Sequence, residues 1–207
     1  MPTLPSDTIE LNALLGSPAG RCRAELTLRL RELDEDLCEH AEWVARASDI
    51  VARKVGVSPT ERAALVDAAW LHDLGKLTIP RRILDKPGPL DELEWVEMRS
   101  HANRGAEYLA QDPGYRCAIP LVRHHHERFD GHGYPDGLSG FAIPIGARII
   151  GVVDAFDAMT TDRPYRRAMP VHDAIAELKR CAQTQFDPAI VETFVAVAPD
   201  MKKGSGR

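Results

Sequence analysis

Apolar positions along the chain recur at three- and four-residue steps, the spacing that puts side chains on one face of an α-helix. The clearest stripe runs from about residue 26 to residue 54 and includes Leu37, Val44 and Val51. Almost no segment alternates apolar and polar residues as a half-buried strand does. The pattern therefore predicts an all-α fold, a helical bundle of about seven helices.

Helix start and stop signals divide the rest of the chain. Ser58-Pro59-Thr60-Glu61 combines an N-cap serine, a proline at the first helical position and a glutamate at the third. It predicts a helix that stops at Gly75. Asp91 and Glu94 predict the start of another helix, which continues to about Leu109. Further helices are expected over residues 115–126, 145–161, 171–181 and 188–197, and the glycine-rich residues 129–144 predict a structured loop.

The ends of the chain differ in composition from the middle. Residues 1–24 are rich in proline, serine and glycine, and we expect a leader or linker with a short helix around residues 10–15. Residues 25–200 would form one domain, and residues 201–207 a flexible tail.

Composition narrows the function classes. A net charge of −5 over 207 residues argues against a broad surface for a nucleic acid polymer. The four cysteines form no CxxC pair, which disfavours disulfides and zinc–thiolate sites and favours a reducing, cytoplasmic location. The sequence contains neither a signal-peptide pattern nor an apolar run of about 20 residues, so no membrane partner is expected.

One short segment carries the first candidate chemistry. His72 and Asp73 stand side by side after an apolar run, and Gly75 and Lys76 follow. An imidazole nitrogen can bind a metal ion, and the two oxygens of one carboxylate can bridge two ions. Lys76 is close enough to meet an anionic substrate. For the pair alone, a buried histidine beside a carboxylate is the structural alternative.

Other imidazoles are spread along the chain. Three consecutive histidines at residues 124–126 have no packing reason, and we expect two of them to be ligands, with a solvated run as the alternative. His40 and His101 lie on amphipathic helices, where a hydrogen-bonded core histidine is the alternative. Asp154 lies on an apolar helix face, where burial of its charge is costly unless a metal or a buried arginine meets it.

Taken together, these candidates are five imidazoles and one or two carboxylates without a thiolate. Such a set suits Fe, Mn, Zn or Ni better than Ca or Mg. It exceeds what one structural zinc ion needs, so two ions bridged by Asp73 fit better. Two such ions would lower the pKa of a bridging water and direct the resulting hydroxide at a phosphorus atom.

Two further segments could meet a phosphate substrate. Gly131 and Gly133 would let the backbone approach a ligand closely, and Tyr134 offers a stacking face and a hydroxyl. A plain surface turn is the alternative. Arg163 and Arg166 follow the predicted Asp154 helix and could grip a phosphate with their forked donors, or they could form a solvated basic face.

The order of these motifs resembles the HD-GYP family, a branch of the HD-domain metal-dependent phosphohydrolases. The resemblance covers about residues 36 to 194. The matching segments are His72-Asp73-Leu74-Gly75-Lys76, Ile79-Pro80, Lys86-Pro87-Gly88, Met98 with His101, residues 125–135, Ile143-Pro144, Ala147-Arg148-Ile149, residues 154–157, Arg163-Pro164-Tyr165-Arg166 and Phe186-Asp187-Pro188.

The resemblance implies a phosphodiesterase that hydrolyses the bacterial second messenger cyclic di-GMP to pGpG or GMP. It implies two divalent transition-metal ions, Fe or Mn, with Asp73 bridging them and Lys76 at the attacking hydroxide or the scissile phosphate. One ion would be held by His40, His72, Asp73 and Asp154, and the other by Asp73, His101, His125 and His126. The implied substrate-binding residues are Tyr134, Arg163, Arg166, Gly131 and Gly133.

One departure and several alternatives stay open. Some members carry a glutamate and a third metal where this chain has Asp36, whose shorter side chain argues against a third ion. The rival functions are an HD-type phosphohydrolase acting on another cyclic dinucleotide or nucleotide, and a catalytically weak cyclic di-GMP-binding signalling module. A homodimer or a signalling-protein partner is also open.

Overall fold

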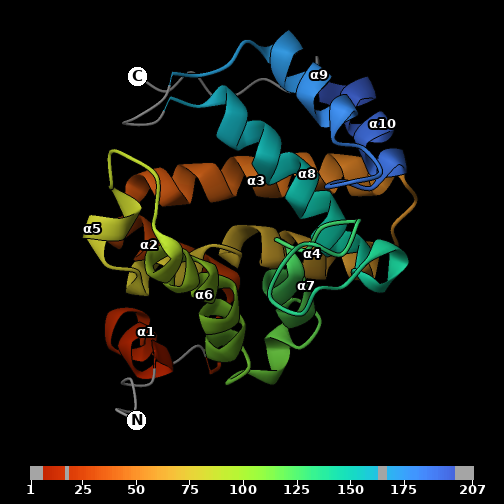
Figure 1. Ribbon diagram of the computed structural model, residues 1–207. Helices are drawn as coiled ribbons and strands as arrows, with labels where there is room; N and C mark the ends of the chain where they lie inside the picture. The colour runs from red at the N-terminus through yellow and green to blue at the C-terminus, as the bar shows by residue number, and fades with distance from the viewer. Residues whose placement is uncertain (1–6, 17–18, 163–166, 199–207) are drawn as a thin grey trace.

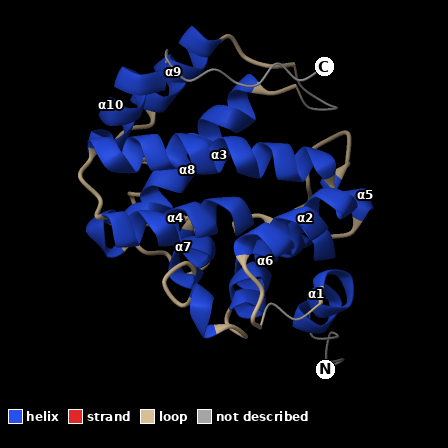
Figure 2. Ribbon diagram, turned by 180° about the vertical axis from the view of Figure 1, so that it is seen from behind, coloured by secondary structure: helices blue, strands red, loops and turns tan. Residues whose placement is uncertain are grey.

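The computed structural model describes residues 7–16, 19–162 and 167–198. Regular structure in these residues is helical, which confirms the all-α prediction (Figures 1 and 2). The α-helices are α1 (Asp7–Leu15), α2 (Arg23–Leu33), α3 (Glu35–Lys54), α4 (Pro59–Leu71), α5 (Arg81–Leu84), α6 (Glu92–Leu109), α7 (Ile119–His124), α8 (Ile145–Thr160), α9 (Val171–Arg180) and α10 (Pro188–Val197). Three short 3-10 helices are η1 (Leu74–Thr78), η2 (Pro113–Tyr115) and η3 (Gly140–Ala142).

The described residues contain more α-helices than the expected seven, partly because one predicted helix is two. Asp34 separates α2 from α3 in an extended conformation, with φ −155° and ψ 99°. Its carboxylate accepts a hydrogen bond from the backbone N–H of Leu37, so it is the N-cap of α3. The predicted caps of α4 and α6 are confirmed: Ser58 with Glu61, and Asp91 with Glu94, form complete capping boxes.

The long helix α3 is central to the bundle and packs against α2, α4, α8 and α10. It runs across the molecule with α4 along one side and α8 crossing it, as Figure 1 shows. Its buried side chains Val44 and Val51 belong to the same apolar core as Leu65 of α4 and Val152 of α8. Burying this stripe is what stabilises the helices, since isolated helices of such length are marginal in water. Helix α6 packs against η1, and helix α7 packs against α4. This part of the bundle carries most of the metal-site candidates, while His40 lies on α3 and Asp154 on α8.

Helix α1 extends the expected short helix toward the N-terminus. Its side chains Leu11 and Leu15 are buried and contribute to the core. The carbonyl of Gly16, which follows it, accepts a hydrogen bond of 2.7 Å from the hydroxyl of Tyr108 on α6. The segment expected as a leader therefore includes a packed helix, and the domain boundaries at residues 24 and 200 stay a prediction.

Gly75 has a different role from the helix stop that we expected. The α-helix ends earlier, at Leu71, and Gly75 lies buried inside η1. A β-carbon added to Gly75 would lie 2.1 Å from the carbonyl oxygen of His101, so only glycine lets η1 approach α6 this closely. This contact places the His72-Asp73 pair beside His101.

A Gly75→Ala substitution is therefore expected to destabilise the protein by roughly 1–3 kcal/mol through overpacking. It should also weaken metal binding, because it pushes Asp73 away from His101. Thermal unfolding and elemental analysis measure the two effects. Gly88→Ala is the matched control, since an added β-carbon there meets nothing within 4 Å. A Gly75→Ala protein that melts and binds metal like the wild type would contradict this packing argument.

Candidate metal centre

The His72-Asp73 pair is held in place by its apolar neighbours. Leu71 and Leu74 on either side are buried in the core, which fixes the pair at the junction of α4 and η1. His72 is fully buried and Asp73 is 2% exposed. Burial of a carboxylate to this degree requires compensating positive charge.

Three imidazoles of the site are oriented by the backbone. The Nδ1 atoms of His72, His101 and His125 lie 2.8, 2.6 and 2.7 Å from carbonyl oxygens three residues earlier, those of Ala69, Met98 and Val122. A neutral ring that donates from Nδ1 leaves the Nε2 lone pair free for a metal ion. The local helical backbone thus sets which nitrogen of each ring faces the centre.

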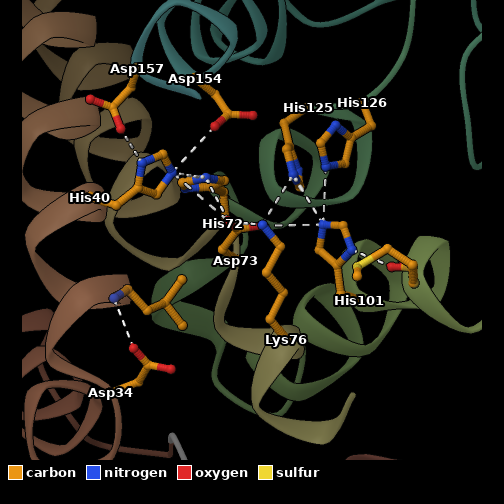
Figure 3. A network of polar contacts seen from close by, with 12 residues as sticks. Asp34, His40, His72, Asp73, Lys76, His101, His125, His126, Asp154 and Asp157 are labelled. Carbon is orange, nitrogen blue, oxygen red and sulfur yellow. Dashed lines mark hydrogen bonds and ion pairs between the residues drawn. The ribbon is translucent and has the colours of Figure 1, made fainter. Parts of the chain in front are cut away.

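One group of ligand atoms combines Asp73 with residues from α6 and the end of α7. His101 Nε2 lies 3.4 Å from His125 Nε2 and 3.1 Å from His126 Nε2. Asp73 Oδ1 lies 3.3 Å from His101 Nε2 and 3.9 Å from His125 Nε2. Ligand atoms of these four residues all lie within 4.8 Å of one another (Figure 3).

A second group lies on the other side of Asp73. His40 Nε2 is 3.4 Å from His72 Nε2, and both face the second carboxylate oxygen, Asp73 Oδ2, at 3.9 and 3.5 Å. Asp154 of α8 adds a carboxylate oxygen 3.3 Å from His40 Nε2, although it lies outside the tight group of His40, His72 and Asp73. Asp73 therefore turns one oxygen toward each group, as a bridging carboxylate would.

These donors fit metal ions. Asp73 Oδ1 is buried and accepts no hydrogen bond, although the ring nitrogens are close to it. Neutral rings whose lone pairs face each other and a carboxylate repel one another unless a cation lies between them. Ligand atoms at about 2.0–2.2 Å from one ion lie about 3–3.5 Å apart, close to the separations found here.

Burial sets the protonation of most rings. It lowers the pKa of His101 to about 4 and of His126 to about 3, and it lowers the pKa of His72 and His125 as well. These four rings are thus neutral and ready to bind metal near neutral pH.

In His40 and Asp73, by contrast, charged neighbours outweigh the effect of burial on the pKa. Burial opposes protonation of His40, but hydrogen bonds to Asp154 and Asp157 outweigh it and raise the pKa of His40 to about 9. For Asp73, burial alone would raise the carboxyl pKa, yet Lys76 and the imidazoles hold it well below its usual range. The Lys76 ammonium forms an ion pair with Asp73 Oδ2, the oxygen that faces His40 and His72.

Metal binding near pH 7.5 is therefore expected to release about one proton per chain, because His40 must lose its proton to become a ligand. The pKa of about 9 lies above the ordinary 6.5, so the release should disappear as the pH rises through 9. Metal affinity should increase over the same range. Titration calorimetry of the metal-free protein in buffers of different ionisation enthalpy measures the release, with His40→Ala as control. A wild-type protein that releases no proton would be inconsistent with this assignment.

Not every expected residue joins the centre. Asp36 is exposed and belongs to neither group, so the described structure gives no support to a third ion there. Arg163 and Arg166 lie outside the described residues, and their phosphate contacts stay a prediction. Gly131 adopts φ +83°, and a β-carbon on Gly133 would lie 2.3 Å from the backbone nitrogen of Arg128. The left-handed backbone conformation accounts for Gly131 and close packing for Gly133, so a substrate contact of either glycine stays a prediction.

The structure adds residues that the sequence did not single out for the site. Asp157 is buried, and its carboxylate lies 2.7 Å from His40 Nδ1, where it orients the ring. Its position one helical turn after Asp154 was the one sequence feature that could have indicated this role.

His124 does not join its two neighbours in the centre. It pairs with Asp136 at 2.9 Å, and Arg123 grips the same carboxylate with two bonds, so the three residues clasp the glycine-rich loop onto α7.

Comparison with known proteins places the chain in a family. Residues 22–190 match the family described as HD domain. The chain is 41% identical over 158 residues to 3'3'-cGAMP-specific phosphodiesterase 3 of Vibrio cholerae, covering 76% of this chain and 34% of the relative. It is 40% identical over 156 residues to the cyclic di-GMP phosphodiesterase response regulator RpfG of Xanthomonas campestris, covering 74% of this chain and 41% of the relative. It thus spans less than half the length of either.

A solved structure shows the same fold. The HDG"Y"P protein Bd1817 of Bdellovibrio bacteriovorus superposes with a TM-score of 0.66 at 18% identity, over 93% of this chain and 61% of that one. None of the described helices is both long and apolar enough to cross a membrane. The family match over most of the chain, the shared fold and the paired imidazole groups around Asp73 agree: the chain belongs to the HD-domain family.

Proposed function

We propose that this centre is a two-metal phosphodiesterase site that hydrolyses cyclic di-GMP to pGpG or GMP. The observation that carries the proposal is the placement of Asp73 between two imidazole groups, one facing each of its oxygens. The curated relatives support the substrate class, since one is named a cyclic di-GMP phosphodiesterase and another a cGAMP-specific phosphodiesterase.

Under this proposal, the two ions are divalent transition metals, Fe or Mn, which suit imidazole and carboxylate ligands. His40, His72, Asp73 and Asp154 would hold one, and Asp73, His101, His125 and His126 the other. When bound, the ions would lower the pKa of a water molecule and offset charge on the phosphate. A third ion at Asp36 is not part of the proposal.

The chain's own side chains bind and orient the substrate. Lys76 is 28% exposed and pairs with Asp73. Once metal ions take over the charge of that carboxylate, its ammonium is available to a phosphate oxygen or the attacking hydroxide. The half-buried Tyr134 packs its ring against His126, with centroids 4.9 Å apart, and would hold the substrate at the rim. Arg163 and Arg166 would grip the phosphates.

Hydrolysis by the metal-loaded protein tests the proposal. The protein is supplied with Mn²⁺ or, without oxygen, Fe²⁺, and products of cyclic di-GMP are separated by chromatography. Linear pGpG or GMP is expected, and none should form after chelation. A metal-loaded protein that binds cyclic di-GMP and leaves it intact would instead favour a signalling module without catalysis.

A second candidate substrate, 3'3'-cGAMP, is favoured by one specific observation. The cGAMP-specific relative is as similar to this chain as the cyclic di-GMP relative, at 41% against 40% identity. Parallel assays with 3'3'-cGAMP therefore decide between two cyclic dinucleotides.

An intracellular messenger as substrate implies a cytoplasmic protein, in keeping with four free cysteines. A homodimer or a signalling-protein partner stays a prediction.

A further inference from the structure

An arginine beside the centre has no role in the site described above. Arg99 is exposed on α6, two residues before His101. Its guanidinium carbon lies 5.5 Å from the ring centroid of Trp95, one turn earlier on the same helix. It also lies 5.4 Å from the ring centroid of Tyr134, which belongs to the glycine-rich loop. The cation is thus held by two aromatic rings from different parts of the chain.

Its charge is not offset by an acid within the described part of the chain. Arg104, five residues later on α6, is buried and pairs with Glu97 at 2.9 Å and with the Thr78 hydroxyl at 2.9 Å. Arg99 makes no ion pair or side-chain hydrogen bond to a described residue. An exposed arginine fixed by rings rather than by a carboxylate keeps its N–H donors for a ligand.

The position of Arg99 relative to the metal-site candidates suits a base rather than the reacting phosphate. Tyr134 lies between them, because its ring contacts Arg99 and also the His126 ring, at 4.9 Å. His126 Nε2 in turn lies 3.1 Å from His101 Nε2 inside one ligand group. In a cyclic dinucleotide, a base is separated from the phosphate by one sugar, so a base can reach Arg99 while its phosphate lies at the centre.

We propose that Arg99 is a specificity residue that binds the O6 and N7 acceptors of a guanine base of the cyclic dinucleotide, with Trp95 as a stacking surface. The two acceptors match the parallel N–H donors of a guanidinium. Adenine presents N7 beside an amino donor, which cannot accept the second hydrogen bond. Trp95 is 45% exposed and leaves ring surface for stacking. The inference rests on the proposed function.

The test compares cyclic di-GMP, cyclic di-AMP and bis(p-nitrophenyl) phosphate, which has no base, as substrates of the Mn-loaded protein. The variants are Arg99→Ala, Arg99→Lys and, as control, Arg116→Ala, an exposed arginine next to η2. We expect Arg99→Ala to lose about tenfold in kcat/KM for cyclic di-GMP, with little change for the other two. Arg99→Lys keeps the charge but not the fork and should lose the guanine preference too. Metal content should be unchanged throughout.

Several outcomes would overturn the inference. Equal losses on all three substrates would mean that Arg99 only supports Tyr134. Unchanged discrimination in Arg99→Ala, or full discrimination in Arg99→Lys, would exclude recognition of the guanine edge. Equilibrium binding of the two dinucleotides gives a second readout that does not need turnover. A binding preference for cyclic di-GMP that Arg99→Ala abolishes would support the inference even if the wild type proved inactive, which would contradict only the proposed function.

Discussion

An Asp73→Ala protein is expected to lose both metal ions and at least about a thousandfold of its phosphodiesterase activity. The reason is the position of the carboxylate. Its oxygens face different imidazole groups, so the substitution removes one ligand from each ion at once. It also removes the only negative charge of the group formed with His101, His125 and His126. Elemental analysis and turnover of cyclic di-GMP measure the two losses.

The control for Asp73→Ala removes a carboxylate elsewhere on the bundle. The partly buried Asp49 pairs with Arg53 and Arg62 and belongs to neither ligand group, so Asp49→Asn should leave metal content and turnover unchanged. Asp73→Asn keeps the size of the side chain and should still lose metal, because an amide offers one oxygen where the site needs two. An Asp73→Ala protein that folds and retains both ions would contradict the bridging role.

Lys76→Met is expected to lower kcat by about 10²–10³-fold while metal content stays at the wild-type level. The two effects separate because Lys76 is not a ligand. Its ammonium pairs with Asp73 Oδ2 and competes with a metal ion for that oxygen. Its removal should leave metal affinity equal or higher, but it takes away a positive charge that would stabilise the phosphate in the transition state.

The exposed Lys179 on α9 provides the matched control, and Lys179→Met should have normal kcat. Metal content is measured on the same samples as turnover. If metal and activity fell together in Lys76→Met, the lysine would be needed to assemble the site, and its proposed contact with the substrate would lose its support.

The sequence predicted most of the helices because local signals determine them. The capping boxes at Ser58 and Asp91 begin α4 and α6 as expected, and the apolar stripe of α3 is buried. The break at Asp34 was missed, since the apolar periodicity continues across it and the cap is a single side chain. The short helix expected around residues 10–15 is α1, which begins earlier, at Asp7, in a segment whose proline and serine content suggested a leader or linker.

For the site, the sequence identified residue types but could not place their atoms. The three adjacent histidines alone left open which two face the centre, and only the family resemblance implied His125 and His126. The structure turns these two inward, while His124 pairs with Asp136. The approach of η1 to α6 over Gly75 is a tertiary contact that no local pattern encodes. The contact between Arg99 and Tyr134 also joins residues that are far apart in the chain, so no local pattern predicts it.

The number of metal ions per chain tests the two-metal assignment most directly. Elemental analysis of protein purified without oxygen, and again after chelation and reloading with Mn²⁺, should give two transition-metal ions per wild-type chain and none in Asp73→Ala. Cyclic di-GMP turnover should follow occupancy and disappear with the ions. A single ion per fully active chain, or full activity in the chelated protein, would contradict a bridged pair at Asp73.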